Sequence, residues 1–328
     1  MFRKTWKTLK YFIILAIILI CLPHSILPHS ATDNPQDETG MYLKQNDAEV
    51  RLMEYKDTPE ALKLKLVQLE IINKSRSKYN AEPVKLDILA SRVANKMSKE
   101  AAENNYTGHW NMAGEKPYHR YGLAGGYDHV SENAFGEWSS ESYQVSDEKI
   151  SSLMKSGHAS FMSERSPNDG HKKNIIEKSH NFVGIGFCLQ GKQFRYYEEF
   201  IDRYFEFENI PGEVKSGEPF NITLKTDGRG FLYFLIVYYE KNPSPLSPAQ
   251  ISRKGSYTDF AEKEYNKLFA WDLSRYRNGI IYQIPLKFST EGLYYIQIYT
   301  DKKELKKPGS LNTKGKTPFS GIVIKVNE

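Results

Sequence analysis

The chain has 328 residues, of which 40% are hydrophobic and 13% are aromatic, and this length and composition suit two folded domains and exclude a disordered chain. Its 45 basic and 40 acidic side chains give a net charge of +5 and are spread along the sequence. Because no basic block stands out, the sequence does not predict nucleic acid as a partner.

Residues 1–31 predict an export signal or an N-terminal anchor. Basic side chains precede the apolar run YFIILAIILICL, which covers residues 11–22 and is too short to span a bilayer comfortably. Cleavage after Ala31 would release the protein, whereas an uncleaved run would hold it at the membrane. Cys21 follows Ile20, which is too large for the usual lipoprotein cleavage signal. We therefore expect a secreted, extracellular or cell-envelope protein.

Two features of the exported part follow directly from composition. Without the leader, Cys188 is the only cysteine, so we expect no internal disulfide and a buried, inert thiol. Residues 32–59 are polar and open with TDNPQDETG, which predicts a linker or a loosely attached arm.

From residue 60 the pattern becomes helical. Apolar side chains recur at spacings of three and four, which predicts a helix with one face toward a core; they are Leu62, Leu66, Leu69 and Ile72. A second helix is expected over residues 86–105, glycine-rich loops over 108–126, and a third helix over 147–164.

Two strands are expected after the third helix, in NFVGIGFCLQG and QFRYYEEFIDRYFEF. In the first, glycine and cysteine alternate with larger apolar residues, so one face of the strand is almost free of side chains. Such a face lets a helix or another backbone lie close to the sheet. Helices and strands together predict a layered α/β/α domain over residues 60–207.

Residues 208–328 have a different sequence pattern. Short runs rich in β-branched and aromatic residues alternate with turn residues; they are FNITLKTDG, FLYFLIVYYE, IIYQIPLKF, GLYYIQIYT and GIVIKV. They predict an antiparallel, immunoglobulin-like β-sandwich with one long insert at residues 241–260. No catalytic cluster is evident in this half, so we expect an accessory module, a spacer or a domain that binds a cell-envelope or surface partner.

Histidine and glutamate occur in three short islands of the first domain. His109 follows the second helix, Glu132 lies in what we expect to be a Ser-Glu-Asn turn, and Glu164 and His171 flank the sequence RSPNDG. Each island alone is weak evidence, because a histidine near a helix end is more often structural. His129 is an alternative partner for Glu132. Arg120 is expected to brace its loop through backbone carbonyls, and His119 is expected to lie in the same loop. We expect His158 and His180 to be exposed.

Taken together, the islands resemble a known family. The stretch LEIINKSRSKYNAEPVKLDILASRVANKMS is similar to the opening helices of the CAP superfamily, the cysteine-rich secretory, antigen-five and pathogenesis-related proteins, also called SCP-like. GEKPYHR with GGY, SENAFG, and GHKKNII with VGIGF resemble further elements of its cysteine-poor bacterial branch, in the same order. The likeness covers roughly residues 62–205.

This resemblance implies a fold and a site. The fold is α+β, a CAP-type α-β-α sandwich over residues 60–207 followed by the β-sandwich at 208–328. The site is a cleft lined by His109, Glu132, Glu164 and His171. Only seven positions separate Glu164 from His171, fewer than in animal members, so Glu164 is the least secure of the four.

Three functions remain open for such a set. Neutral imidazoles of His109 and His171 could bind Zn²⁺ or another divalent cation, with a glutamate as their hydrogen-bond partner, and the cleft would then bind a ligand. A carboxylate could instead take a proton from metal-bound water, as in an extracellular peptidase-like hydrolase. The third function is lipid or sterol carriage, which the resemblance suggests. No nucleophile elbow or HExxH helix accompanies the set, so the sequence does not decide whether the protein is an enzyme.

Overall fold

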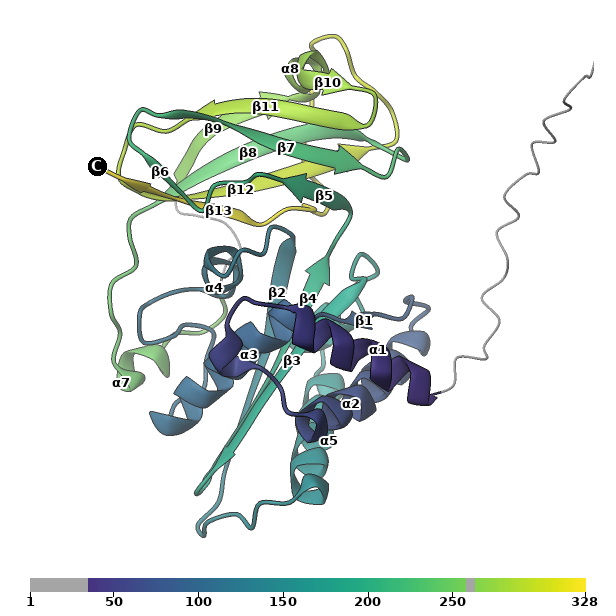
Figure 1. Ribbon diagram of the computed structural model, residues 1–328, viewed down its shortest axis with the longest axis vertical. Helices are drawn as coiled ribbons and strands as arrows, with labels where there is room; N and C mark the ends of the chain where they lie inside the picture. The colour runs from purple at the N-terminus through teal and green to yellow at the C-terminus, as the bar shows by residue number, and fades with distance from the viewer. Residues whose placement is uncertain (1–34, 258–262) are drawn as a thin grey trace, which may run out of the picture.

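The computed structural model describes residues 35–257 and 263–328, so the leader predicted over residues 1–31 lies outside the described part of the chain. A four-stranded sheet with helices on both faces is followed by two sheets that face each other (Figure 1). The chain is therefore α+β, with an α-β-α sandwich ahead of a β-sandwich, as expected. No helix among the described residues has the length and apolar character needed to cross a membrane.

The α-β-α sandwich is built from six helices and four strands of the described chain. The helices are α1 (Pro35–Ala48), α2 (Pro59–Ser77), α3 (Ile88–Glu103), α4 (Pro117–Leu123), α5 (Asp147–Ser163) and α6 (Gly170–Ile175). The strands are β1 (Lys85–Leu86), β2 (His129–Trp138), β3 (Phe182–Gln190) and β4 (Gln193–Asp202). Side chains cap the starts of three helices by accepting backbone N–H bonds, as short polar side chains do at this position; they are Thr58, Asp87 and Ser146.

The strands follow the order β1-β3-β4-β2, with β1 parallel to β3 and the other pairs antiparallel. Apolar side chains of α2 and α5 pack on one face, where Ile185 and Phe200 are buried, and α3 packs on the other, against Ile201 and Tyr197. β2 is an edge strand and carries the predicted site residue Glu132. The expected Ser-Glu-Asn turn is therefore wrong, because residues 129–138 pair with β4 along their whole length.

The glycine face of β3 brings α3 unusually close to the sheet, as the sequence predicts. A Cβ atom at Gly184 would lie 2.3 Å from the backbone carbon of Ala90, and one at Gly186 would lie 2.2 Å from that of Ala94. Real Cβ atoms do not approach backbone so closely, so the two glycines set the distance between helix and sheet. Cys188, next along this face, is partly buried and free.

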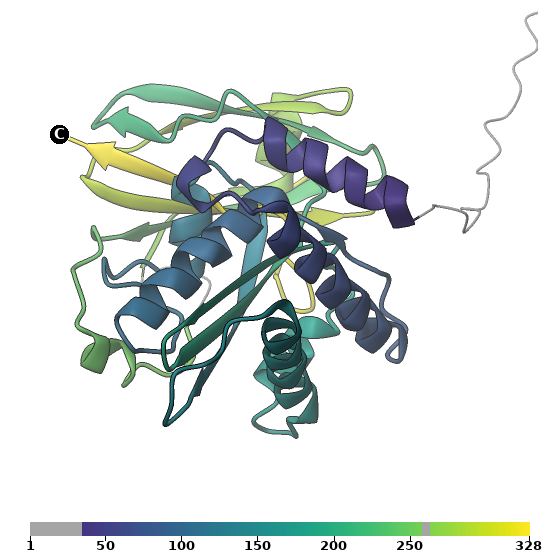
Figure 2. The same ribbon diagram turned by 60° about the horizontal axis from the view of Figure 1, so that its bottom comes forward.

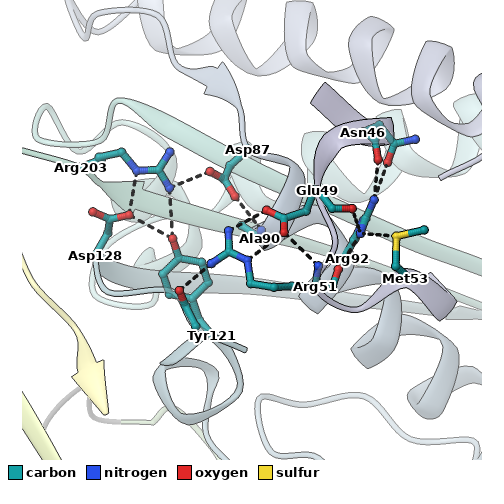
Figure 3. A network of polar contacts seen from close by, with 11 residues as sticks. Asn46, Glu49, Arg51, Met53, Asp87, Ala90, Arg92, Tyr121, Asp128 and Arg203 are labelled. Atoms are coloured by element: carbon teal, nitrogen blue, oxygen red, sulfur yellow. Dashed lines mark hydrogen bonds and ion pairs between the residues drawn. The ribbon is translucent and has the colours of Figure 1, made fainter. Parts of the chain in front are cut away.

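The prediction of a polar linker over residues 32–59 is wrong for its structured part. Helix α1 and the turn η1 (Met53–Tyr55) pack on the sandwich (Figure 2). The side chain of Tyr42 is only 3% exposed. The buried guanidinium of Arg92 on α3 donates to the backbone carbonyls of Asn46, Glu49 and Arg51 (Figure 3). The polar composition misleads because much of the attachment is made by backbone carbonyls of this segment, with Tyr42 as its buried aromatic side chain.

A second polar cluster joins the end of β4 to the start of α3. Arg203 donates to Asp87 over 2.7 Å and to Asp128 over 2.8 Å, and Tyr121 of α4 donates to Asp128 over 3.1 Å (Figure 3). Burial raises the pKa of Asp128 to about 6, and Arg203 opposes this rise. Helix α4 falls within residues 108–126, where we expected loops only.

The β-sandwich begins at Phe205. One sheet has the order β10-β11-β7-β5 and the other the order β6-β13-β12-β8-β9, with a shared apolar core between them. The strands are β5 (Phe205–Glu208), β6 (Glu213–Lys215), β7 (Pro219–Thr226), β8 (Phe231–Glu240), β9 (Lys263–Phe269), β10 (Arg277–Asn278), β11 (Ile281–Lys287), β12 (Gly292–Asp301) and β13 (Ile322–Asn327). All five predicted strand runs form strands, and the pairing is antiparallel except that β6 is parallel to β13.

Short helical segments complete this half. They are α7 (Pro248–Ile251), α8 (Ala270–Leu273) and η2 (Ser274–Tyr276). Helix α7 belongs to the long insert between β8 and β9, and Figure 1 shows it away from the sandwich, beside the first domain.

We predict that replacing Gly186 by alanine lowers the free energy of unfolding by about 1–3 kcal/mol, because the added methyl group must push α3 off the sheet. Urea unfolding followed by circular dichroism measures the change. Gly212→Ala is the matched control, since no atom lies within 4 Å of a Cβ built there. Equal stability of the two variants would contradict the prediction.

Candidate functional site

A cleft of about 500 Å³ lies beside the edge strand β2. The four residues expected at the site come from three separate places in the chain, and all four line this cleft: His109, Glu132, Glu164 and His171. Helix α5 ends at Ser163 and α6 begins at Gly170, so the turn between them places Glu164 and His171 on one side.

The first pair joins His109 to Glu132. Nδ1 of His109 lies 2.8 Å from Oε1 of Glu132, whose side chain is fully buried. The other oxygen of Glu132 accepts a hydrogen bond from Arg120, and Arg120 also donates to the backbone carbonyl of His109 over 2.6 Å. Arg120 therefore braces the His109 loop through a carbonyl, as expected, and also fixes the carboxylate beside it.

The second pair joins His171 to Glu164. Nδ1 of His171 is hydrogen-bonded to Oε1 of Glu164, and Oε2 accepts the backbone N–H of His171 over 3.0 Å. Phe161, in the preceding turn of α5, stacks on the imidazole with ring centroids 4.7 Å apart. Despite the short spacing, Glu164 therefore partners His171.

Both imidazoles consequently have the same arrangement. A carboxylate accepts from Nδ1 in each case, which leaves Nε2 as the nitrogen that can bind a ligand. The ring centroids of His109 and His171 are 6.3 Å apart. Burial and, secondarily, Arg120 lower the pKa of His109 to about 4, so this imidazole is neutral at neutral pH.

Sequence reasoning missed Glu199. It lies directly opposite Glu132 in the pairing of β4 with β2 and is fully buried, 3.5 Å from Arg120. Burial and the neighbouring charge of Glu132 raise the pKa of Glu199 well above its usual range, so Glu199 is the protonated member of the pair. The available signal was the doublet Glu198-Glu199 between the aromatic residues Tyr196-Tyr197 and Phe200 of the same strand.

The other histidines lie in separate networks. His129 does not partner Glu132, because its Nδ1 lies 2.9 Å from Asp202. The expected exposure of His158 and His180 is wrong, since both are at most 3% exposed. His180 also binds Asp202, and His158 lies between Glu198 and Ser75.

His119 also departs from its expected place in a loop. It lies in α4, and its Nε2 is 3.4 Å from a carboxylate oxygen of Glu240 in the β-sandwich.

A further residue reaches the cleft from the second half of the chain, where no site residue was expected. Tyr257 lines the cleft, its ring centroid lies 4.7 Å from that of His109, and its hydroxyl accepts the backbone N–H of Glu132 over 2.8 Å. Only the length of the insert at 241–260 could have drawn attention to it.

The donor set fits an open cation site better than a closed one. In the described residues, no group of three or more His, Cys, Asp or Glu side chains is placed to hold a metal. Two imidazoles bound to one tetrahedral Zn²⁺ have ring centroids roughly 5 Å apart, so His109 and His171 would approach each other by about 1 Å. Water or another ligand would complete the coordination.

Comparison with known proteins supports the sequence resemblance. The family model described as CAP, the cysteine-rich secretory protein family, matches residues 69–200. No curated protein matches the chain.

Three solved structures are similar to parts of the chain. One is an extracellular protein containing an SCP domain from Bacillus anthracis (20% identity, 42% of this chain and 40% of that chain, TM-score 0.33). Another is an outer surface protein of Borrelia burgdorferi (16% identity, 43% and 93%, TM-score 0.32). The third is a cysteine-rich secretory protein of Staphylococcus aureus (13% identity, 43% and 39%, TM-score 0.30). The chain thus spans less than half the length of the first and third.

The family match falls on the segment that forms the α-β-α sandwich and contributes all four expected cleft residues. The family match thus identifies a CAP domain over residues 69–200 of the chain.

Proposed function

We propose that this protein is exported and binds a ligand in its CAP cleft through Nε2 of His109 and His171. One observation supports this most strongly: each imidazole has Nδ1 fixed by its own glutamate, and both line the same cleft. A divalent cation such as Zn²⁺ is the simplest ligand for two neutral imidazoles, with Glu132 and Glu164 orienting the rings.

Export is part of the proposal. The N-terminal sequence has the basic start and the apolar run of about twelve residues that characterise a signal peptide. The remaining chain has a single cysteine, Cys188, and relies on its apolar cores for stability.

Hydrolysis is less well supported than binding. A general base must reach a water molecule bound in the cleft. Glu132 is fully buried and its two oxygens are occupied by His109 and Arg120, while Glu164 accepts from His171 at both oxygens. Lipid carriage is likewise less well supported, because charged and amide side chains, Asn133 and Asn174 among them, line the cleft.

Zinc binding tests the proposal directly. We expect isothermal titration calorimetry to detect Zn²⁺ binding to the purified protein and to find it abolished when His109 and His171 are both replaced by alanine. Glu164→Gln should weaken binding by about 10- to 100-fold, because the neutral amide orients and polarises the imidazole less well.

Glu141→Gln provides the control for these titrations, since it removes one exposed carboxylate outside the cleft. Zn²⁺ affinity that is unchanged in the double histidine variant would contradict the proposal.

The protonation of His109 gives a second, independent prediction. Its pKa of about 4 in the folded protein is below the ordinary value of about 6.5. NMR titration of the imidazole should therefore show His109 neutral at pH 5.5, and a midpoint near 6.5 would contradict the burial argument.

The stability of the folded protein should therefore depend on pH in a defined direction. Because folding lowers this pKa, the stabilising contribution of the neutral ring is complete above about pH 6.5 and is lost as the pH falls toward 4. His109→Gln, which cannot be protonated, should unfold with a shallower pH dependence in this interval.

A further inference from the structure

The insert between β8 and β9 leaves the β-sandwich and packs on the CAP domain. Ile251 is completely buried there, in a cluster with side chains of α3 and its neighbours. Leu246 donates its backbone N–H to the carbonyl of Met112 over 2.8 Å, and Ser244 lies against Gly114. The segment is therefore anchored to the CAP domain at several points before it reaches the cleft.

The anchored segment ends at the predicted site. The ammonium group of Lys254 lies 4.7 Å from the ring of Trp110, the residue after His109. Tyr257 then contacts Trp110 edge-on with centroids 6.4 Å apart, and lies against the imidazole of His109 at 4.7 Å. The bond from the Glu132 N–H to the tyrosine hydroxyl fixes the ring in this position.

The two imidazoles differ in exposure accordingly. The side chain of His109, against which Tyr257 lies, is 14% exposed, whereas that of His171, on which Phe161 stacks, is 33% exposed. Glu132 is hydrogen-bonded to Nδ1 of His109 and Arg120 to its backbone carbonyl, while the ring of Tyr257 lies against the imidazole within the cleft.

We infer that Tyr257 is a specificity-determining residue of the CAP cleft, contributed by the second half of the chain. Its ring covers one side of His109, so a ligand reaches that imidazole only from the side shared with His171. Ligands small enough to fit between the two imidazoles are admitted, and bulkier groups are kept from His109. The β-sandwich therefore takes part in the site, beyond the role of an accessory module.

Chemical modification tests this without assuming any natural ligand. Diethyl pyrocarbonate acylates neutral imidazoles, and peptide mass spectrometry gives a separate rate for each histidine. In the wild-type protein we expect His171 to react several-fold faster than His109. Tyr257→Ala should raise the His109 rate several-fold and leave the His171 rate unchanged.

Two further variants separate the ring from its hydroxyl. Tyr257→Phe keeps the ring and should keep His109 protected, while Tyr257→Leu should expose it partly. Tyr276→Ala, at an exposed tyrosine of the same half, should change neither rate. Circular dichroism melting checks folding, and the phenylalanine and leucine variants preserve the test if the alanine variant does not fold.

A His109 rate that is equal in wild type, Tyr257→Leu and Tyr257→Ala would overturn the inference, as would a parallel rise at His171. A second part of the modification experiment rests on the proposed function and uses Zn²⁺ as the probe. Zn²⁺ should slow modification of both histidines in wild type. If it does not, the proposed cation site fails, while the modification rates still decide the role of Tyr257.

Discussion

Arg120 is buried, and its guanidinium holds together three segments that are distant in the chain. It extends from α4, donates to the carbonyl of His109, binds the carboxylate of Glu132 on β2, and lies beside Glu199 on β4. A buried guanidinium without hydrogen-bond acceptors would cost several kcal/mol, so the loop and the strand edge must both come to it. The position of His109, and with it one side of the cleft, depends on this requirement.

The same cluster explains how three ionisable groups, Arg120, Glu132 and Glu199, can lie together in the interior. Glu132 and Glu199 are opposite each other on paired strands, and two negative charges there would repel strongly. The guanidinium neutralises one carboxylate and Glu199 keeps its proton, so the cluster carries little net charge. Burial and, secondarily, the charge of Arg120 lower the pKa of His109 to about 4, so its imidazole is unprotonated at neutral pH. In this state it can bind a cation or accept a hydrogen bond.

Much of the fold could be predicted because its signals are local. The apolar spacing of α2, the glycine face of β3 and the turn-separated runs of the β-sandwich each report on their own segment. The cleft residues were also predictable, but only through the order of several short motifs, since a single histidine or glutamate carries little information. The helix α4 escaped prediction because glycines at both its ends favoured a loop.

What the sequence did not reveal depends on partners far along the chain. His158 and His180 become buried because Glu198 and Asp202 on β4 are there to pair with them. Residues 35–55 form a packed element because Arg92 needs carbonyl acceptors, although their composition is that of a linker. Tyr257 joins the cleft through an insert whose own residues give no sign of where it will dock.

The docking of this insert has a consequence for how the molecule matures. Glu132 and Tyr257 are 125 positions apart, so their contact is among those that raise the contact order of the chain. During synthesis from the N-terminus the CAP sandwich can collapse first, yet one wall of its cleft is still missing. The lining of the cleft is complete only after synthesis has passed Tyr257, well into the second domain.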